Sequence, residues 1–308
     1  MLEGVIRGKR KPPRVVIYGP QGVGKSTFGS ESPKPIFVCT EDGVDNIPVD
    51  QMPRPATWND LLANVRRVAE GKHEYKTLVL DTLNGAVDLA VQHICATQYS
   101  GQMVAKRGDG GFRAWGQGFD STSDEQRNLL IPFDQCRKRG MGVIVLAHAG
   151  IQNVRNPISG DYSKCAPDIH RAIWARWSAW ADIIGHADYD YAVVSDGRHG
   201  KAVGSSIRKV VFAGSAAEDA KCRVGYELPD QMELNYEAFA QALGKPDSTL
   251  DEIRSLWDVL TGEEVKQALA WLGVQKIEDA PITKARQLLN RLREKRAAQN
   301  AESKEVAA

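Results

Sequence analysis

Short apolar runs alternate with segments of helical periodicity through the first half of the chain. Four β-rich runs predict strands at residues 14–18, 36–39, 77–80 and 142–147. All but the third are nearly continuously apolar, as are strands that helices cover on both faces. Between them, apolar residues recur at helical spacing within 61–69, 87–95 and 129–136. This alternation predicts an α/β fold with a mostly parallel sheet.

Two longer segments interrupt the alternation, and we expect both to be irregular loops. Residues 99–123 are rich in glycine, and residues 149–168 hold two prolines and a Gly160-Asp161 turn. Long loops inside compact domains are commonly functional. The runs that follow predict strands of an antiparallel extension of the sheet, at 189–195, 207–212 and 223–228.

The chain changes character near residues 244–248, where Gly-Lys-Pro-Asp-Ser interrupts the pattern. Beyond this break, apolar stripes at helical spacing lie within 250–260, 265–272 and 282–292. The last dozen residues are polar and rich in alanine. We therefore predict a core domain at 1–246, a small helical domain at 247–296 and a disordered tail at 297–308.

The composition indicates the class of protein and the cellular environment. The 40 Lys and Arg residues balance the 39 Asp and Glu residues, and 42% of the chain is hydrophobic, which excludes wholesale disorder. Five cysteines are scattered without a C-x-x-C pair, which favours reduced thiols over disulfides or zinc. No apolar run approaches the roughly 18 residues of a membrane span, and no basic-then-apolar leader opens the chain. We expect a soluble, cytoplasmic protein without a membrane partner.

Residues 19–26 read Gly-Pro-Gln-Gly-Val-Gly-Lys-Ser and match the P-loop pattern G-x-x-x-x-G-K-[ST]. The motif directly follows an apolar strand and precedes the start of a helix, which is the context that phosphate binding needs. Lys25 is expected to reach the β- and γ-phosphates of ATP, and the Ser26 hydroxyl to ligate Mg²⁺. The predicted nucleotide contacts are Gly19, Pro20, Gln21, Gly22, Val23, Gly24, Lys25, Ser26 and Thr27.

Three further strand ends carry polar residues suited to ATP hydrolysis. Asp81 ends the third run and is the candidate second magnesium ligand, the Walker B acid. Glu41 follows the second run, at the sheet edge where ligands bind, and is the candidate carboxylate that orients or deprotonates the attacking water. Asp42 beside it is the substitute candidate. His148 ends the fourth run and is a candidate sensor of the γ-phosphate.

The order of these parts resembles the RecA-like branch of P-loop ATPases: a P-loop, then strands ending in Glu41, Asp81 and His148, then a basic loop. More narrowly, about residues 10–240 resemble phage-encoded RecA-core ATPases, including Sak-type single-strand annealing proteins of phage recombination modules. The narrower cues are the segments VLAH at 145–148, WADII at 180–184, AKCR at 220–223 and LP at 228–229. RecA itself differs at His148, where it has glutamine.

The resemblance implies roles for several residues. Glu41 would be the catalytic carboxylate and His148 the phosphate sensor, and 149–168 would be the DNA-contacting loop. Lys221 and Arg223 would be candidates to reach ATP across a subunit interface of a homo-oligomer, as fingers supplied in trans. The location would be the host cytoplasm if the chain is phage-encoded.

Together these features predict an ATP- and Mg²⁺-dependent, DNA-stimulated ATPase that promotes annealing or strand exchange of single-stranded DNA. The expected contacts to the DNA backbone are Lys106, Arg107, Arg113, Arg155 and Lys164. The basic last helix is a candidate contact for DNA or a single-strand-binding protein. A replicative helicase or loader motor is the alternative. A small-molecule P-loop kinase is disfavoured by Glu41 and by the long chain after His148.

Overall fold

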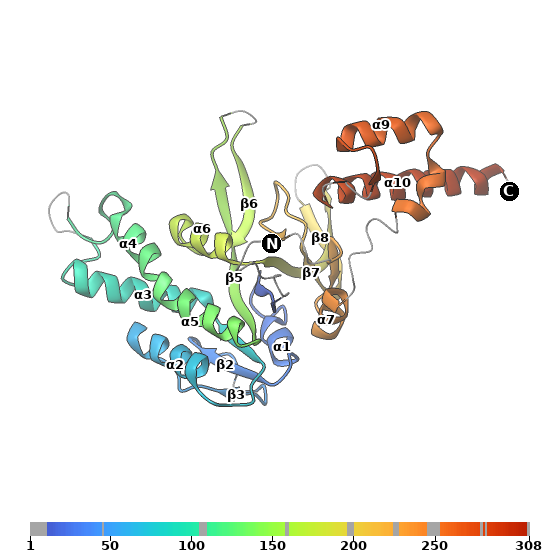
Figure 1. Ribbon diagram of the computed structural model, residues 1–308. Helices are drawn as coiled ribbons and strands as arrows, with labels where there is room; N and C mark the ends of the chain where they lie inside the picture. The colour runs from blue at the N-terminus through green and yellow to red at the C-terminus, as the bar shows by residue number, and fades with distance from the viewer. Residues whose placement is uncertain are drawn as a thin grey trace, which may run out of the picture. The chain divides into compact units, whose positions relative to one another are not determined.

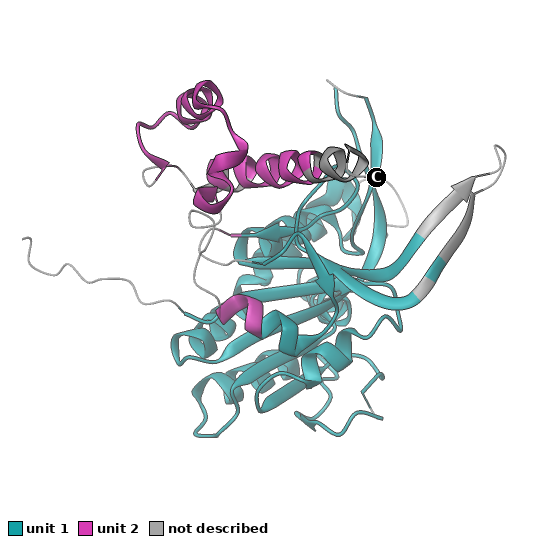
Figure 2. Cartoon of the chain, turned by 90° about the vertical axis from the view of Figure 1, so that its right-hand side faces the viewer, with its two compact units in different colours: residues 1–222, 228–240 teal, residues 223–227, 241–308 magenta. Residues whose placement is uncertain are grey.

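The computed structural model describes residues 11–44, 46–104, 110–157, 160–195, 200–223, 228–244, 253–277, 280 and 282–306. The chain divides into two compact units, residues 1–222 with 228–240, and residues 223–227 with 241–308 (Figure 2). Among the described residues, no helix has both the length and the apolar character needed to span a membrane. The predicted P-loop and strand ends all belong to the first unit.

The described part of the first unit is built on a mixed sheet of ten strands. The strands on its main path are β1 (Arg14–Gly19), β2 (Pro35–Cys39), β3 (Asp50–Gln51), β4 (Thr77–Asp81), β5 (Gly142–Val154), β7 (Ile183–Ser195), β8 (Gly200–Val211) and β10 (Gln231–Glu233). Their order is β10-β8-β7-β1-β5-β4-β2-β3. The path from β7 to β3 is parallel, and β8 and β10 extend it antiparallel. The predicted fold class is confirmed.

Helices cover both faces of this sheet (Figure 1). One face and its helices share a single apolar cluster, and these helices are α2 (Trp58–Glu70), α3 (Leu83–Gln98), α5 (Arg127–Lys138) and α6 (Arg171–Trp180). The other face is covered by α1 (Lys25–Ser30) and α7 (Tyr236–Gly244), where Phe28 and Phe239 pack edge to face. Strands buried on both faces are continuously apolar, which is why their positions could be predicted.

The parallel strands end together at one edge of the sheet. The register places Gly19 opposite His148, and Asp81 opposite both Cys39 and Leu146. Carboxyl ends of parallel strands are where open α/β sheets bind ligands. The register alone therefore gathers the P-loop and the three predicted strand ends.

Residues 149–168 do not form the irregular loop that the sequence predicted. Strand β5 continues to Val154 and pairs antiparallel with β6 (Tyr162–Pro167), from Ala149 opposite Pro167 to Val154 opposite Tyr162. The resulting hairpin projects beyond the neighbouring helix α6 (Arg171–Trp180) in Figure 1. Pairing satisfies the backbone groups that an irregular loop would have to give to water. The segment 99–123 is also partly helical, with a 3₁₀ turn η1 (Ala114–Gly116) leading into α4 (Gln117–Glu125).

The described part of the second unit is helical. It contains a 3₁₀ turn η2 (Trp257–Val259), α9 (Gly262–Leu272) and α10 (Ile282–Val306), which share an apolar cluster. A capping box at Thr261 and Glu264 begins α9. The last helix runs to Val306, through residues that we expected to form a disordered tail. Alanine, glutamate, lysine and glutamine in this stretch are strong helix formers, so the helix propagates beyond its packed face.

Candidate nucleotide-binding site

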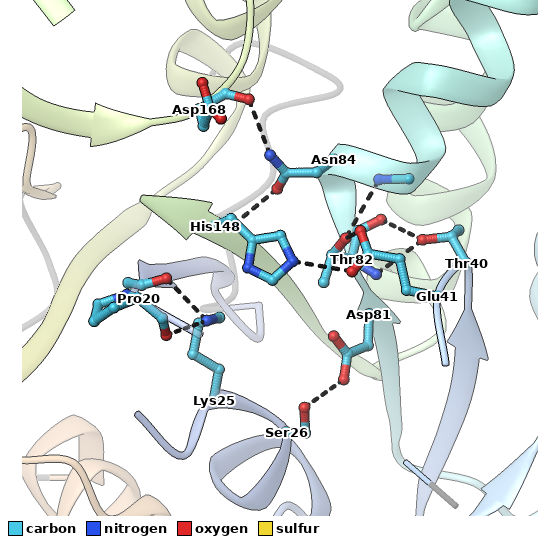
Figure 3. A network of polar contacts seen from close by, with 12 residues as sticks. Pro20, Lys25, Ser26, Thr40, Glu41, Asp81, Thr82, Asn84, His148 and Asp168 are labelled. Atoms are coloured by element: carbon cyan, nitrogen blue, oxygen red, sulfur yellow. Dashed lines mark hydrogen bonds and ion pairs between the residues drawn. The ribbon is translucent and has the colours of Figure 1, made fainter. Parts of the chain in front are cut away.

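The P-loop closes around the ammonium group of Lys25. Strand β1 ends at Gly19, α1 begins at Lys25, and between them Gly22 and Gly24 adopt positive φ angles of 79° and 104°. Lys25 Nζ donates to the carbonyl oxygens of Gly19 (2.9 Å) and Pro20 (2.8 Å) (Figure 3). Burial lowers the pKa of Lys25, while the charges of Asp81 and Glu41 act in the opposite direction. The amine is thus held inside the loop that wraps phosphates.

Ser26 and Asp81 meet beside this lysine. Ser26 Oγ donates to Asp81 Oδ2 at 2.6 Å. Burial raises the pKa of Asp81, and the Ser26 hydrogen bond and the charge of Lys25 oppose that rise. Mg²⁺ prefers a few protein oxygens completed by phosphates and water, so this hydroxyl and carboxylate fit such an ion. When bound there, Mg²⁺ would neutralise charge on the β- and γ-phosphates.

Glu41 is held by two hydrogen bonds at the same edge of the sheet. Its Oε2 accepts from His148 Nε2 at 2.9 Å, and its Oε1 accepts from Thr82 Oγ1 at 2.5 Å (Figure 3). Burial raises the pKa of Glu41, but these two bonds outweigh it, and the net pKa is lowered. An ionised carboxylate only accepts hydrogen bonds, so His148 carries its proton on Nε2.

Hydrogen bonds between the ends of β2 and β4 hold the backbone next to Glu41 in place. Thr40 Oγ1 donates to the Thr82 carbonyl oxygen at 2.8 Å and accepts from the Thr82 backbone N–H at 2.9 Å. Gly85, in the first turn of α3, permits this approach, because a Cβ there would lie 2.4 Å from Thr40 Oγ1. Thr82, which caps α3, was not among the residues that the sequence predicted.

These groups line a pocket of about 390 Å³. Its walls are Gln21, Gly22, Gly24, Lys25, Ser26, Thr27, Glu41, Asp42, Gly43, Ile47, Asp81, Thr82, His148 and Arg208. Asp42 pairs with Arg54 and its side chain is 79% exposed, whereas Glu41 is fixed against His148. The pocket thus joins the P-loop, both magnesium-ligand candidates, the preferred acid and the sensor candidate. It also contains Arg208, which no sequence motif indicated.

Of the predicted P-loop contacts, Gly19, Pro20 and Val23 do not line the pocket, and neither do the described DNA-contact candidates. Arg155 is exposed near the tip of the β5–β6 hairpin, and Arg113 is exposed before η1. Lys164 pairs with Asp219 at 3.5 Å. Lys106 and Arg107 lie outside the described residues.

The two predicted trans-acting residues lie at and just after β9 (Lys221–Cys222). Lys221 Nζ donates to the Ser178 carbonyl oxygen in α6 of its own chain. Arg223 is exposed at the end of the described segment. Their roles toward a second subunit stay predictions.

The sheet order, the P-loop and the carboxylates at its edge define the core of a P-loop NTPase. Residues 11–224 match the AAA domain family, and the chain belongs to that family. Residues 11–224 are therefore an AAA-type P-loop ATPase domain, with a site that binds nucleotide.

Proteins similar to this chain include a prophage-derived protein and a recombinase of known structure. The SPbeta prophage-derived uncharacterized protein YorG of Bacillus subtilis (strain 168) is 26% identical over 139 residues, which cover 44% of this chain and 40% of that protein. The chain thus spans less than half the length of this relative. The crystal structure of the RadB recombinase is similar with 14% identity and a TM-score of 0.35, over 65% of this chain and 80% of that one.

Proposed function

We propose that this protein is an ATP- and Mg²⁺-dependent ATPase that single-stranded DNA stimulates, and that it promotes annealing or strand exchange in phage-type recombination, as Sak-type proteins do. The observation that carries the proposal is a continuous set of hydrogen bonds from Glu41 to the base of the β5–β6 hairpin. Glu41 belongs to the nucleotide pocket and the hairpin projects from the sheet, so one network joins the two.

The network runs through His148 and α3 (Figure 3). The His148 ring donates to Glu41, and its backbone N–H donates to Asn84 Oδ1 at 2.8 Å. Asn84 Nδ2 donates to the Asp168 carbonyl oxygen at 2.9 Å. The backbone N–H of Asp168 in turn donates to the His148 carbonyl oxygen, also at 2.9 Å. His148 and Asp168 are the two ends of the hairpin, so a displacement of either end changes the geometry around Glu41.

Glu41 orients water best when few other donors compete for its oxygens, each of which can accept two hydrogen bonds. In the structure both oxygens accept hydrogen bonds, one from His148 and one from Thr82. A hairpin shift that draws His148 away removes the competing donor at Oε2, so that this oxygen accepts more strongly from water and orients it. DNA on the hairpin would in this way raise the rate of hydrolysis.

The hairpin offers a cation to the DNA backbone. Arg155 is exposed where β5 ends, and the exposed Arg113 is a further contact in the proposal, together with Lys106 and Arg107, which precede it in the sequence. Lys164 contributes less, because Asp219 already neutralises it. A homo-oligomer in the host cytoplasm and a single-strand-binding protein complete the proposed setting.

The test is ATP hydrolysis with and without single-stranded DNA, in the wild type and four variants. We expect DNA to raise the wild-type rate, and Lys25→Ala and Glu41→Gln to abolish turnover. Arg155→Ala should leave the DNA-free rate unchanged, weaken activation by DNA and reduce the salt slope of binding by about 0.7, the value for one phosphate contact on a single strand.

Lys72→Ala is the matched control, since Lys72 is exposed and precedes β4 at the opposite edge of the sheet. Its DNA activation and salt slope should equal those of the wild type. Hydrolysis that single-stranded DNA leaves unchanged at low and physiological salt would refute the proposal. Catalysed unwinding of a forked duplex, without annealing, would replace it with the helicase alternative.

A further inference from the structure

We propose that Arg208 contacts the phosphates of bound nucleotide and that it does so from the same chain that supplies the P-loop. The inference rests on nucleotide hydrolysis at the described pocket and not on DNA binding. It assigns a role to a residue outside the P-loop motif and outside the strand ends.

The sheet register brings Arg208 to the P-loop. Strand β7 lies beside β1, and β8 lies beside β7 with Arg208 opposite Tyr189. Side chains that face each other across paired strands point to the same side of a sheet. Tyr189 Oη donates to the Gly22 carbonyl oxygen at 3.3 Å, so this side is the one on which the P-loop lies.

Arg208 then lies against the loop itself. A Cβ added at Gly24 would lie 2.8 Å from Arg208 Nη1 and 3.6 Å from its Cζ. Gly24 is the residue before Lys25, with φ of 104°, so any side chain there is both strained and obstructed by the guanidinium. Arg208 also lines the pocket that contains Lys25, Ser26 and Glu41.

The charge of Arg208 is uncompensated within the described part of the chain. The acids of the pocket have other partners: Asp81 accepts from Ser26, Glu41 from His148, and Asp42 pairs with Arg54. The next residue along β8, Lys209, pairs with Asp190 at 3.1 Å. An exposed, permanently charged guanidinium beside phosphate-binding backbone is suited to anionic phosphate oxygens, which it can bind with two parallel hydrogen bonds.

A cation from the same chain makes the site complete in one subunit. Lys25 and Arg208 together provide two positive groups, from α1 and β8. Lys221, one of the two candidate fingers in trans, donates to the carbonyl oxygen of Ser178 in its own chain. The hydrolysis rate per chain should therefore not depend on a neighbour's arginine or lysine.

The first experiment compares Arg208→Ala, Arg208→Lys and Lys209→Ala, with DNA absent. Removal of one charge-stabilising donor typically costs about 100- to 1,000-fold in turnover, and we expect Arg208→Ala to fall in that range. Arg208→Lys should recover part of the loss, because it keeps the charge and loses the paired donors. Lys209→Ala is the control on the same strand and should hydrolyse ATP as the wild type does. Arg208 is exposed, so thermal unfolding of all variants should match.

The second experiment decides whether the arginine acts within one chain. Arg208→Ala keeps an intact P-loop and Lys25→Ala keeps an intact Arg208, so an arginine supplied in trans would restore activity when the two are mixed. We expect no restoration at any total concentration. Restored hydrolysis in the mixture would overturn the assignment. So would an Arg208→Ala variant whose turnover and whose affinity for a fluorescent ATP analogue both lie within twofold of the wild-type values.

The outcomes separate this inference from the proposed function. A slow Arg208→Ala variant in a protein that DNA does not stimulate refutes the DNA-dependent function and supports the arginine contact. A DNA-stimulated protein with a fully active Arg208→Ala variant supports that function and refutes the contact.

Discussion

At the scale of single residues, two carboxylates of the pocket have pKa values displaced in opposite directions. Burial dominates at Asp81 and raises its pKa, while hydrogen bonds from His148 and Thr82 outweigh burial at Glu41 and lower its pKa. Groups whose surroundings separate their pKa values commonly have separate roles at a site. Asp81, next to Ser26 and Lys25, is suited to a cation, and Glu41 is suited to water.

Replacement of His148 by alanine should therefore shift the pH dependence of hydrolysis. In the native site the Glu41 carboxylate stays ionised below its usual titration range, so the acidic limb of the turnover profile lies at low pH. Without the His148 hydrogen bond, burial remains and raises the pKa, so the limb should move to higher pH. A profile of turnover against pH, at saturating ATP, measures this shift.

His148→Gln is the matched control for this measurement. A glutamine amide can donate to Glu41, so its acidic limb should lie between those of the wild type and His148→Ala. Acidic limbs that coincide in the wild type and His148→Ala would contradict the role given to this hydrogen bond.

At the scale of elements, β1 and β7 are joined where they begin, at the edge away from the nucleotide pocket. Asp182, which precedes β7, accepts from the backbone N–H of Arg14 at 3.0 Å, from its Nη2 at 2.8 Å and from its Nε at 3.1 Å. Arg137 in α5 adds an ion pair at 3.2 Å, and Trp180 lies 5.3 Å from the Arg14 guanidinium. This cluster fixes the strand that leads into the P-loop.

Replacement of Asp182 by alanine should destabilise the first unit. It removes the main carboxylate partner of two largely buried guanidinium groups, which typically costs about 3–5 kcal/mol. For a unit of this size the melting temperature should fall by roughly 6–20 °C. Asp134→Asn is the control, because Asp134 is more exposed than Asp182 and its contact with Arg14 is longer, at 3.4 Å. Its replacement should cost below about 1 kcal/mol. Equal melting temperatures for Asp182→Ala and the wild type would contradict this account.

The contribution of this cluster to the free energy of unfolding should depend on pH, and the direction follows from the pKa of Asp182. Burial raises the pKa of Asp182, but the hydrogen bonds and charge of Arg14 outweigh it, so the folded pKa is lowered. The contribution of Asp182 to stability is therefore complete above about pH 5, above the unfolded pKa of about 3.9, and is lost as pH falls through the folded value. The alanine variant should lack this component of acid destabilisation.

The elements that could be predicted from the sequence are those whose pattern depends only on burial. The central strands are apolar on both faces, so the predicted ends of the first three lie within one residue of the observed ones. The β5–β6 hairpin was missed because its residues are half exposed, from Gln152 and Asn153 to the 72%-exposed Ile151. Such a strand is stabilised by its partner, which a local pattern does not contain.

The same distinction applies to the pocket. Lys25 and Ser26 lie in a contiguous motif, and Glu41, Asp81 and His148 lie at strand ends that a parallel sheet must align. Arg208 instead reaches the P-loop across two strand pairings, β8 with β7 and β7 with β1. Its position depends on the register of an antiparallel extension, which the sequence does not fix locally.

At the scale of the whole molecule, two of the apolar clusters among the described residues belong to different units. One cluster lies between the sheet and four helices, and the other is confined to the second unit, with Leu289 and Leu292 of α10 among its buried residues. The nucleotide pocket is lined by residues of the first unit alone. The free energy of nucleotide binding should therefore stabilise the first unit directly.

We expect calorimetry of the full chain to resolve two unfolding transitions, of which only one rises with ATP and Mg²⁺. At a ligand concentration 100 times the dissociation constant, binding adds about 2.7 kcal/mol to the unit that holds the site. Leu289→Ala removes a buried side chain from the other cluster, costs about 2–5 kcal/mol there, and should lower only the transition that ATP leaves unchanged. A single transition that both ATP and Leu289→Ala displace would mean that the two units unfold together, and the nucleotide would then stabilise the helical unit as well.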